Sequence, residues 1–229
     1  MPTCHVVVLF TLILFDSIMG QMQSKTEILE YHEMSKHYFD KYAESSGRMD
    51  WRNQPNPHRQ FNTNVIQLPM PNGQSSFLFH NLFMPVQQQT TTQPFNQQNI
   101  ADMLYYSFSL SGRKKAGRNE WFLRVNPSSG NLHPCEVYLV LPPNIVGDHQ
   151  EQPGLFHYNA LHHGLEQRAS FGGGSIYSSG SRSSSGSSSG SGSSSGDKVQ
   201  YIYVGITTIF WRESWKYGVR AFRYCELDT

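Results

Sequence analysis

The eleven residues from Arg124 to Pro134 have the composition of a site that binds an anion or a flat redox cofactor. They read Arg-Val-Asn-Pro-Ser-Ser-Gly-Asn-Leu-His-Pro, which is rich in turn-forming residues. The flanking segments 121–123 and 136–141 are apolar, so we expect a strand, a turn, one helical turn and a second strand. Backbone N–H groups at such a helical start hold anions. The local alternative is an ordinary strand-turn-strand, since Asn-Pro and Ser-Gly occur in loops of every fold class.

A second candidate is a row of cations near the end of the sequence. Arg212, Lys216 and Arg220 recur every four residues and fall on one face of a helix predicted to start at Trp211. The neighbouring face is an apolar stripe, formed by Trp211, Trp215, Phe222 and Cys225. Three like charges with only Glu213 beside them repel one another, so we expect an anion or an acidic surface to face the row. The alternative is a solvated helix face.

Histidines and cysteines give no metal or disulfide site. His32 and His37 are five residues apart, whereas the His-Glu-x-x-His pattern of zinc proteases needs a separation of four. The adjacent pair His162-His163 points to different faces and makes a poor chelate. The cysteines at positions 4, 135 and 225 form no CxxC pair, and we expect Cys135 to be a small buried hydrophobe. No bound metal is predicted.

Length and composition indicate one folded domain, expected over residues 26–229. The chain has 229 residues, of which 38% are apolar and 13% aromatic, enough for a sizeable core. The formal net charge of +1 gives no general argument for nucleic acid or an anionic membrane as a partner. Any anion site must therefore be local.

The first 20 residues have the size of a signal peptide. Residues 6–15 form an apolar run followed by small residues, but no Lys or Arg precedes the run. A signal peptide and a stray leader both remain open, and with them a secretory or a cytoplasmic location. The run is too short to span a bilayer, so no membrane span is predicted.

Hydrophobic periodicity places most of the regular elements. Helical spacing predicts helices over 26–45 and 100–110 and a helical turn over 162–169. Apolar and β-branched runs predict strands over 154–158 and 199–206.

Three segments are expected to lack regular structure. Residues 50–73 are rich in Pro, Asn and Gln, which predicts an extended surface arm of the kind that often wraps a partner subunit. The Gln/Thr tract 87–98 predicts a surface loop. Residues 170–196 contain 15 Ser and 8 Gly, too few apolar groups to offset the entropy of ordering, so a disordered loop is predicted over 170–197.

Four separate blocks of the sequence, in the same order, resemble the SagB-type dehydrogenase branch of the FMN-dependent nitroreductase family. The blocks are Tyr31–His37, Asp50–Pro57, Arg124–Glu136 and Trp211–Tyr224. The resemblance covers about residues 28–168 and 199–228, and an ordered set of four blocks is far more specific than any one of them. It implies an α+β fold with three α/β/α layers built on a central mixed sheet.

The resemblance also implies a homodimer with FMN at the subunit interface and ping-pong hydride transfer through the flavin. The hydride would come from NAD(P)H or from a small-molecule or peptide substrate, and in this branch the substrate reaction is oxidation of an azoline to an azole. No catalytic residue is assigned. Carried over residue by residue, the implied FMN contacts are Arg124, Pro127, Ser128, Ser129, Asn131, Lys216 and Arg220.

The sequence departs from the family pattern in two places. The Arg-Arg-Ser-x-Arg phosphate motif of many nitroreductases is missing, and the only comparable basic cluster is Arg113–Lys115 with Arg118. The sequence ends at Thr229, where the family continues with a long core helix and basic phosphate ligands, so we expect a fold that is incomplete at the C-terminus. The alternatives are a truncated, non-catalytic remnant without flavin and a secreted, Ser/Gly-rich structural protein.

Overall fold

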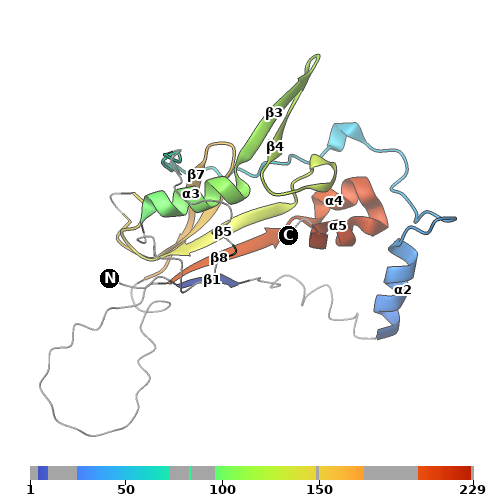
Figure 1. Ribbon diagram of the computed structural model, residues 1–229, viewed down its shortest axis with the longest axis horizontal. Coiled ribbons are helices and arrows are strands. Elements are labelled where there is room, and N and C mark those ends of the chain that lie inside the picture. Colours follow the sequence, from blue (N-terminus) through green and yellow to red (C-terminus); the bar gives the residue numbers. More distant parts are fainter. Residues whose placement is uncertain are drawn as a thin grey trace, which may run out of the picture.

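A mixed six-stranded sheet forms the centre of the structure, a computed structural model that describes residues 5–9, 25–72, 83, 96–147, 150–172 and 201–227 (Figure 1). The strand order is β1-β8-β5-β6-β7-β2. Strand β1 runs parallel to β8, and every other pair of neighbours is antiparallel. The strands are β1 (His5–Leu9), β2 (Val65–Gln67), β5 (Cys135–Leu141), β6 (Gly154–Asn159), β7 (Gly164–Ser170) and β8 (Tyr201–Thr208).

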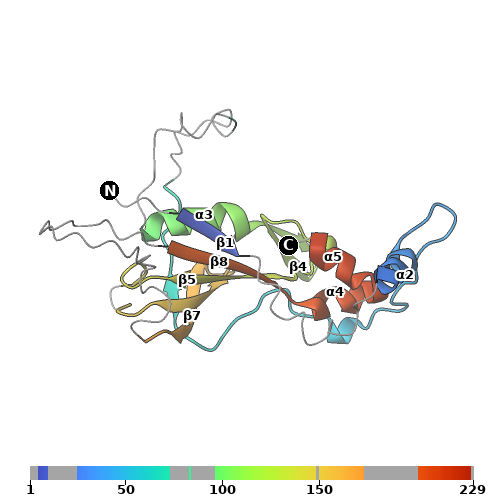
Figure 2. The ribbon, with the colours of Figure 1, turned by 90° about the horizontal axis from the view of Figure 1, so that it is seen from below.

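Helices and a separate hairpin surround this sheet. The hairpin of β3 (Leu110–Ala116) and β4 (Asn119–Arg124) projects away from it (Figure 1). Helix α3 runs along the sheet, whereas α2, α4 and α5 gather near one end of it (Figure 2). The helices are α2 (Lys25–Ser35), α3 (Gln97–Phe108), α4 (Phe210–Tyr217) and α5 (Ala221–Leu227), with the 3-10 turns η1 (Trp51–Asn53), η4 (Ser129–Asn131) and η5 (Gly218–Arg220). Within the described segments no helix is long and apolar enough to cross a bilayer.

The apolar face of the sheet packs against α3. Successive strand residues point to opposite faces, and on β5 the side chains of Val137, Leu139 and Leu141 are at most 3% exposed. The same core cluster contains three buried residues of α3, namely Ile100, Ala101 and Leu104. One side of the sheet therefore has an ordinary hydrophobic core.

The opposite face of the sheet is polar, and residues 55–61 of the same chain lie over it. The Phe61 ring lies 5.1 Å from the His157 ring, and the Arg168 guanidinium lies 3.6 Å from the Phe61 ring centre. The chain then joins the sheet edge as β2, antiparallel to β7. The arm predicted over 50–73 is thus largely extended, with the short elements η1 and β2 inside it, and it covers its own sheet.

Several sequence predictions are confirmed. Strand β4, the single turn η4 and strand β5 follow one another as expected around residues 124–134. The strands predicted over 154–158 and 199–206 are β6 and β8, and the helix predicted over 100–110 is α3. Cys135 is buried, as expected.

Two helical predictions need correction. The helix predicted over 26–45 ends at Ser35, whose Oγ donates a 2.6 Å hydrogen bond to the Tyr31 carbonyl; beyond it His37 packs on Tyr42 in a loop. The helical turn predicted over 162–169 is wrong, because this segment is mostly strand β7. Pairing with β6 on one side and β2 on the other outweighs the local apolar spacing.

The helix predicted from Trp211 is broken at Gly218, which has a φ of +52°. A Cβ there would also lie 3.3 Å from the Ser46 Cα, so a glycine is needed at this position. The predicted apolar stripe is correct for the buried Trp215 and Cys225, whereas Trp211 is 55% exposed.

Some expectations fall on residues outside the described segments. This applies to residues 87–95 of the Gln/Thr tract and to residues 173–197 of the Ser/Gly tract; Ser170 belongs to β7. Within the first 20 residues, positions 5–9 form β1 and the rest lie outside the described segments.

Candidate functional site

The turn at η4 is held in shape by its own side chains. Gly130 and Asn131 have φ values of +67° and +59°, which only a few residue types adopt at low cost. Ser128 Oγ accepts a 2.7 Å hydrogen bond from the His133 N–H, and Asn131 Nδ2 donates a 2.9 Å bond to the Phe122 carbonyl. These bonds fix the turn without a ligand.

Helix α4 lies directly against this turn. Its start is anchored by the 2.8 Å hydrogen bond from the Ile209 N–H to the Pro134 carbonyl. A Cβ built on Gly130 would lie 2.5 Å from Lys216 Nζ and 2.9 Å from Tyr217 Oη. The structure therefore brings Lys216 to the turn that contains Pro127, Ser128, Ser129 and Asn131.

Arg124 connects the turn to the arm. Its guanidinium donates to the carbonyls of Cys135 and Pro57 at 3.1 and 3.0 Å and lies 3.4 Å from His58 Nδ1. Burial is the main cause that lowers the pKa of Arg124. The buried Nε of Arg124 and the buried Oδ1 of Asn126 have no hydrogen-bond partner among the described residues.

Arg220 does not join this group. Its Nε donates to the Ser35 carbonyl at 3.3 Å, and its guanidinium lies 4.9 Å from the centre of the Tyr224 ring. Arg212 is only 3% exposed and forms a 2.6 Å ion pair with Glu136. The predicted row of three cations is therefore not a common anion-facing surface, because two of its members bind other parts of the chain.

A buried charged cluster lies on the polar face of the sheet, and sequence analysis did not anticipate it. His157 Nε2 lies 2.8 Å from Glu136 Oε2, and its Nδ1 lies 2.9 Å from Glu166 Oε2, with all three side chains 1% exposed. Asn159 Nδ2 donates a 2.8 Å hydrogen bond to Glu166 Oε1. One feature of the sequence could have indicated this cluster: the charged residue Glu136 lies within an otherwise apolar predicted strand.

The pKa values of the cluster follow from its charges. Burial raises the pKa of Glu136, but the hydrogen bond from His157 and the charges of Arg212 and Arg124 outweigh burial and lower it overall. Burial, then the charge of Arg124, lowers the pKa of His58 to about 4. Both causes also lower the pKa of His133 to about 3. The two histidines are neutral at pH 7.

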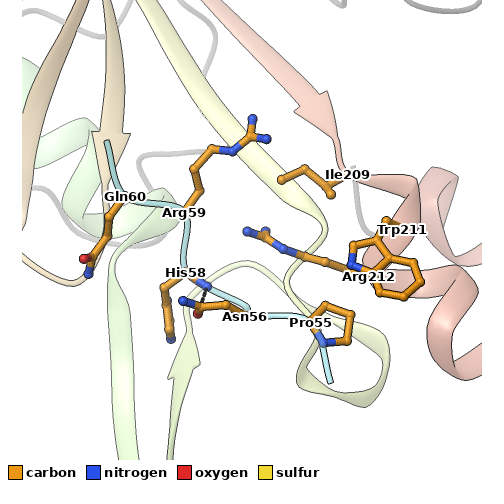
Figure 3. Close-up of a pocket in the computed structure, with 8 residues that line it drawn as sticks. All are labelled: Pro55, Asn56, His58, Arg59, Gln60, Ile209, Trp211 and Arg212. Carbon is orange, nitrogen blue, oxygen red and sulfur yellow. Dashed lines mark hydrogen bonds between the residues drawn. The ribbon is translucent and has the colours of Figure 1, made fainter. Parts of the chain in front are cut away.

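An open cleft of about 320 Å³ lies between the arm and the start of α4 (Figure 3). It is lined by Pro55, Asn56, His58, Arg59, Gln60, Ile209, Trp211 and Arg212. None of the residues predicted to contact FMN lines it. Residues 55–60 received no ligand role from their sequence, because an irregular arm shows no periodicity from which its neighbours could be inferred.

Comparison with known proteins identifies the fold. No family model and no curated protein matches the sequence. Among solved structures, a predicted nitroreductase from Anabaena variabilis matches with a TM-score of 0.55 and 24% identity. The chain has a nitroreductase fold. The match covers 87% of this chain and 35% of the Anabaena chain. This chain therefore spans about a third of the length of that relative. The predicted α+β class with a central mixed sheet is confirmed.

Two more distant structures show weaker similarity to this nitroreductase fold. A predicted nitroreductase from Ralstonia eutropha has 22% identity and a TM-score of 0.29, covering 51% of this chain and 49% of that one. The Escherichia coli microcin synthetase complex McbBCD, bound to truncated pro-MccB17, has 18% identity and a TM-score of 0.39, covering 94% and 66%. Neither similarity is strong enough to support a conclusion about this chain.

Proposed function

We propose that the chain is a flavin-dependent oxidoreductase of the nitroreductase type and that FMN binds against the turn formed by Pro127–Asn131. The observation that supports this proposal is the approach of Lys216 and Tyr217 to Gly130, which places a cation and a hydroxyl donor beside the turn. A reduced flavin ring carries negative charge and needs such donors near it.

The residues present fit this cofactor. Arg124 Nε is a buried donor and Asn126 Oδ1 a buried acceptor, and neither has a hydrogen-bond partner among the described residues. Buried polar atoms normally have partners, so a polar ligand at this turn would satisfy them. In this proposal Lys216 supplies charge, while Ser128 and Asn131 maintain the shape of the turn. Bound FMN would supply hydride transfer in two half-reactions of a ping-pong cycle.

The finer parts of the proposal concern partners and substrate. FMN would lie at the interface of a homodimer, with phosphate contacts from outside the residues named above. The hydride would come from NAD(P)H or from a small-molecule or peptide substrate, with the azoline oxidation of the SagB-type branch as the reaction. These statements rest on the sequence resemblance and on the shared fold.

The competing proposal is a non-catalytic remnant without flavin. The internal hydrogen bonds of Arg124, Ser128 and Asn131 favour it, because three of the expected FMN contacts are already engaged within the chain. The two proposals differ in one measurable property, the binding of FMN.

Titration of the purified chain with FMN, followed by quenching of flavin fluorescence, tests the proposal. We expect saturable binding, and we expect Lys216→Gln to weaken it about tenfold, since a charge-assisted hydrogen bond contributes roughly 1.5–3 kcal/mol. Lys41→Gln removes the same charge from an exposed position in the loop after α2 and should leave the affinity unchanged. Absence of binding at any chain concentration, including concentrations at which a dimer forms, would favour the remnant.

A further inference from the structure

We infer that the cleft between the arm and α4 binds a small planar molecule that carries an oxyanion, either a carboxylate or a phosphate. In this arrangement Arg59 binds the oxyanion and Trp211 contacts the planar part (Figure 3). The residues that line this cleft are different from those of the turn at Pro127–Asn131. The site does not depend on flavin binding and can be tested without flavin.

Arg59 is the cation that this cleft offers to a ligand. Its side chain extends into the cleft from the arm (Figure 3) and is exposed. Its guanidinium carbon lies 5.6 Å from the centre of the Phe61 ring, and Nη1 donates a long, 3.4 Å bond to Tyr138 Oη. Among the described residues no carboxylate forms an ion pair with it, whereas Arg113 and Arg212 each have one. A guanidinium held in this way can bind an oxyanion with two parallel hydrogen bonds.

The inner wall of the cleft adds positive charge. Arg212 lines the cleft, and Arg124 lies behind it in contact with His58. Of the carboxylates, Glu136 pairs with Arg212, and Glu166 faces His157 deeper in the sheet. After burial, the charges of Arg124 and Arg212 lower the pKa of His58, while the charge of Glu136 raises it.

Apolar groups form the other wall. Ile209 and Trp211 lie opposite Arg59 across the cleft, and Pro55 closes one end of it (Figure 3). Trp211 is 55% exposed, and its indole offers a flat surface to an aromatic or conjugated group. The volume of about 320 Å³ is near the lower end for small-molecule pockets. It suits an acid of one or two rings and excludes a dinucleotide.

Binding of matched probes to the full chain, without FMN, tests this inference. Benzoate and phenyl phosphate carry the oxyanion, and benzamide is the neutral counterpart of benzoate. Ligand-observed NMR titration should show saturable binding of both acids, with benzamide at least about tenfold weaker. The stronger of the two acids identifies the carboxylate or the phosphate as the preferred group.

Variants locate the binding in the cleft. We expect Arg59→Gln to weaken binding of the acids about tenfold. Arg59→Lys should weaken it less, because lysine keeps the positive charge but lacks the planar guanidinium that forms two parallel hydrogen bonds. Trp211→Ala should weaken the acids and benzamide alike. Arg118→Gln removes a charge from the hairpin and should change nothing.

Three results would overturn the inference. The first is equal affinity for benzoate and benzamide in the unmodified chain, which needs no variant to fold. The second is an equal effect of Arg59→Gln and Arg118→Gln. The third is displacement of the probes by FMN in direct competition, since that would make the cleft part of a flavin site. If FMN fails to bind, the expected affinities for benzoate, phenyl phosphate and benzamide stay the same, because these probes are titrated without FMN.

Discussion

Among single residues, Gly130 allows the turn and α4 to meet. Its φ of +67° is one requirement for glycine, and the closeness of Lys216 and Tyr217 is a second, independent one. Gly117, at the tip of the hairpin, has a similar φ of +60°, but a Cβ at that position would have no atom within 4 Å. A comparison of the two glycines therefore separates the effect of a left-handed backbone from the effect of the contact with Lys216 and Tyr217.

We predict that Gly130→Ala exposes Lys216 and that Gly117→Ala does not. Each substitution should lower the free energy of unfolding by about 1–2 kcal/mol, the cost of a left-handed alanine. Only at Gly130 must a methyl group displace the end of the lysine chain. Acetylation of surface amines, followed by mass spectrometry, should show faster modification of Lys216 in Gly130→Ala alone. Equal labelling of Lys216 in both variants would mean that Lys216 does not rest on the turn.

The sequence identified the residues that form the turn, but not the groups to which they are hydrogen-bonded. Arg124, Ser128 and Asn131 were recognised through local turn chemistry and a family resemblance. Their hydrogen bonds to Pro57, His133 and other backbone groups depend on how distant segments fold together, which no local pattern contains. His157 and Glu166 were missed for the same reason, because their roles exist only once β5, β6 and β7 are side by side.

At the scale of elements, the buried cluster joins the sheet to the helices. Glu136 on β5 contacts His157 on β6 through one carboxylate oxygen and Arg212 on α4 through the other. Arg212 also donates to the His133 carbonyl before β5. Burying these charges is costly, and the mutual contacts offset that cost only while every member is present.

We predict that Glu136→Gln destabilises the protein by about 3 kcal/mol, because it leaves Arg212 buried without a counter-charge. Urea denaturation monitored by tryptophan fluorescence measures the loss. Glu120→Gln removes one carboxylate of the exposed pair with Arg113 and is the matched control, expected to leave the midpoint unchanged. Similar midpoints for the two variants would show that the buried cluster contributes no net stability.

The elements that sequence analysis assigned wrongly are those fixed by other elements. Strand β7 was predicted as a helical turn because its apolar spacing is ambiguous over so few residues; its pairing with β6 and β2 decides the outcome. The break at Gly218 lies against Ser46, which is far away in the sequence. By contrast, β5 carries the apolar run Val137–Leu141 and β8 is rich in β-branched and aromatic residues, and both were predicted correctly.

On the scale of the whole molecule, the net charge of +1 is small, but ionisable side chains buried in the fold have shifted pKa values. Burial, and after it the charges of Arg124 and Arg212, lowers the pKa of His58 and of His133 and keeps both histidines neutral at pH 7. Burial also lowers the pKa of His163, so three histidines of the described residues bind protons more weakly in the folded state than in the unfolded chain. This difference links the stability of the fold to pH.

We predict that the melting temperature falls as the pH is lowered from 7 towards 4, beginning near pH 6.5. In the unfolded chain His58 and His133 take up protons near their ordinary pKa of 6.5, whereas the folded protein takes them up only near pH 4 and pH 3. The unfolded state thus binds more protons throughout this window, and stability is lost as the pH falls. The lowered pKa of Glu136 acts in the same direction below about pH 4.5, because protonation removes its pairing with Arg212. Calorimetry of His58→Gln should show a shallower fall between pH 6.5 and pH 5 than calorimetry of the unmodified chain. A melting temperature that stays constant from pH 7 to pH 5 would mean that none of the three histidines with a lowered pKa is kept neutral by the fold.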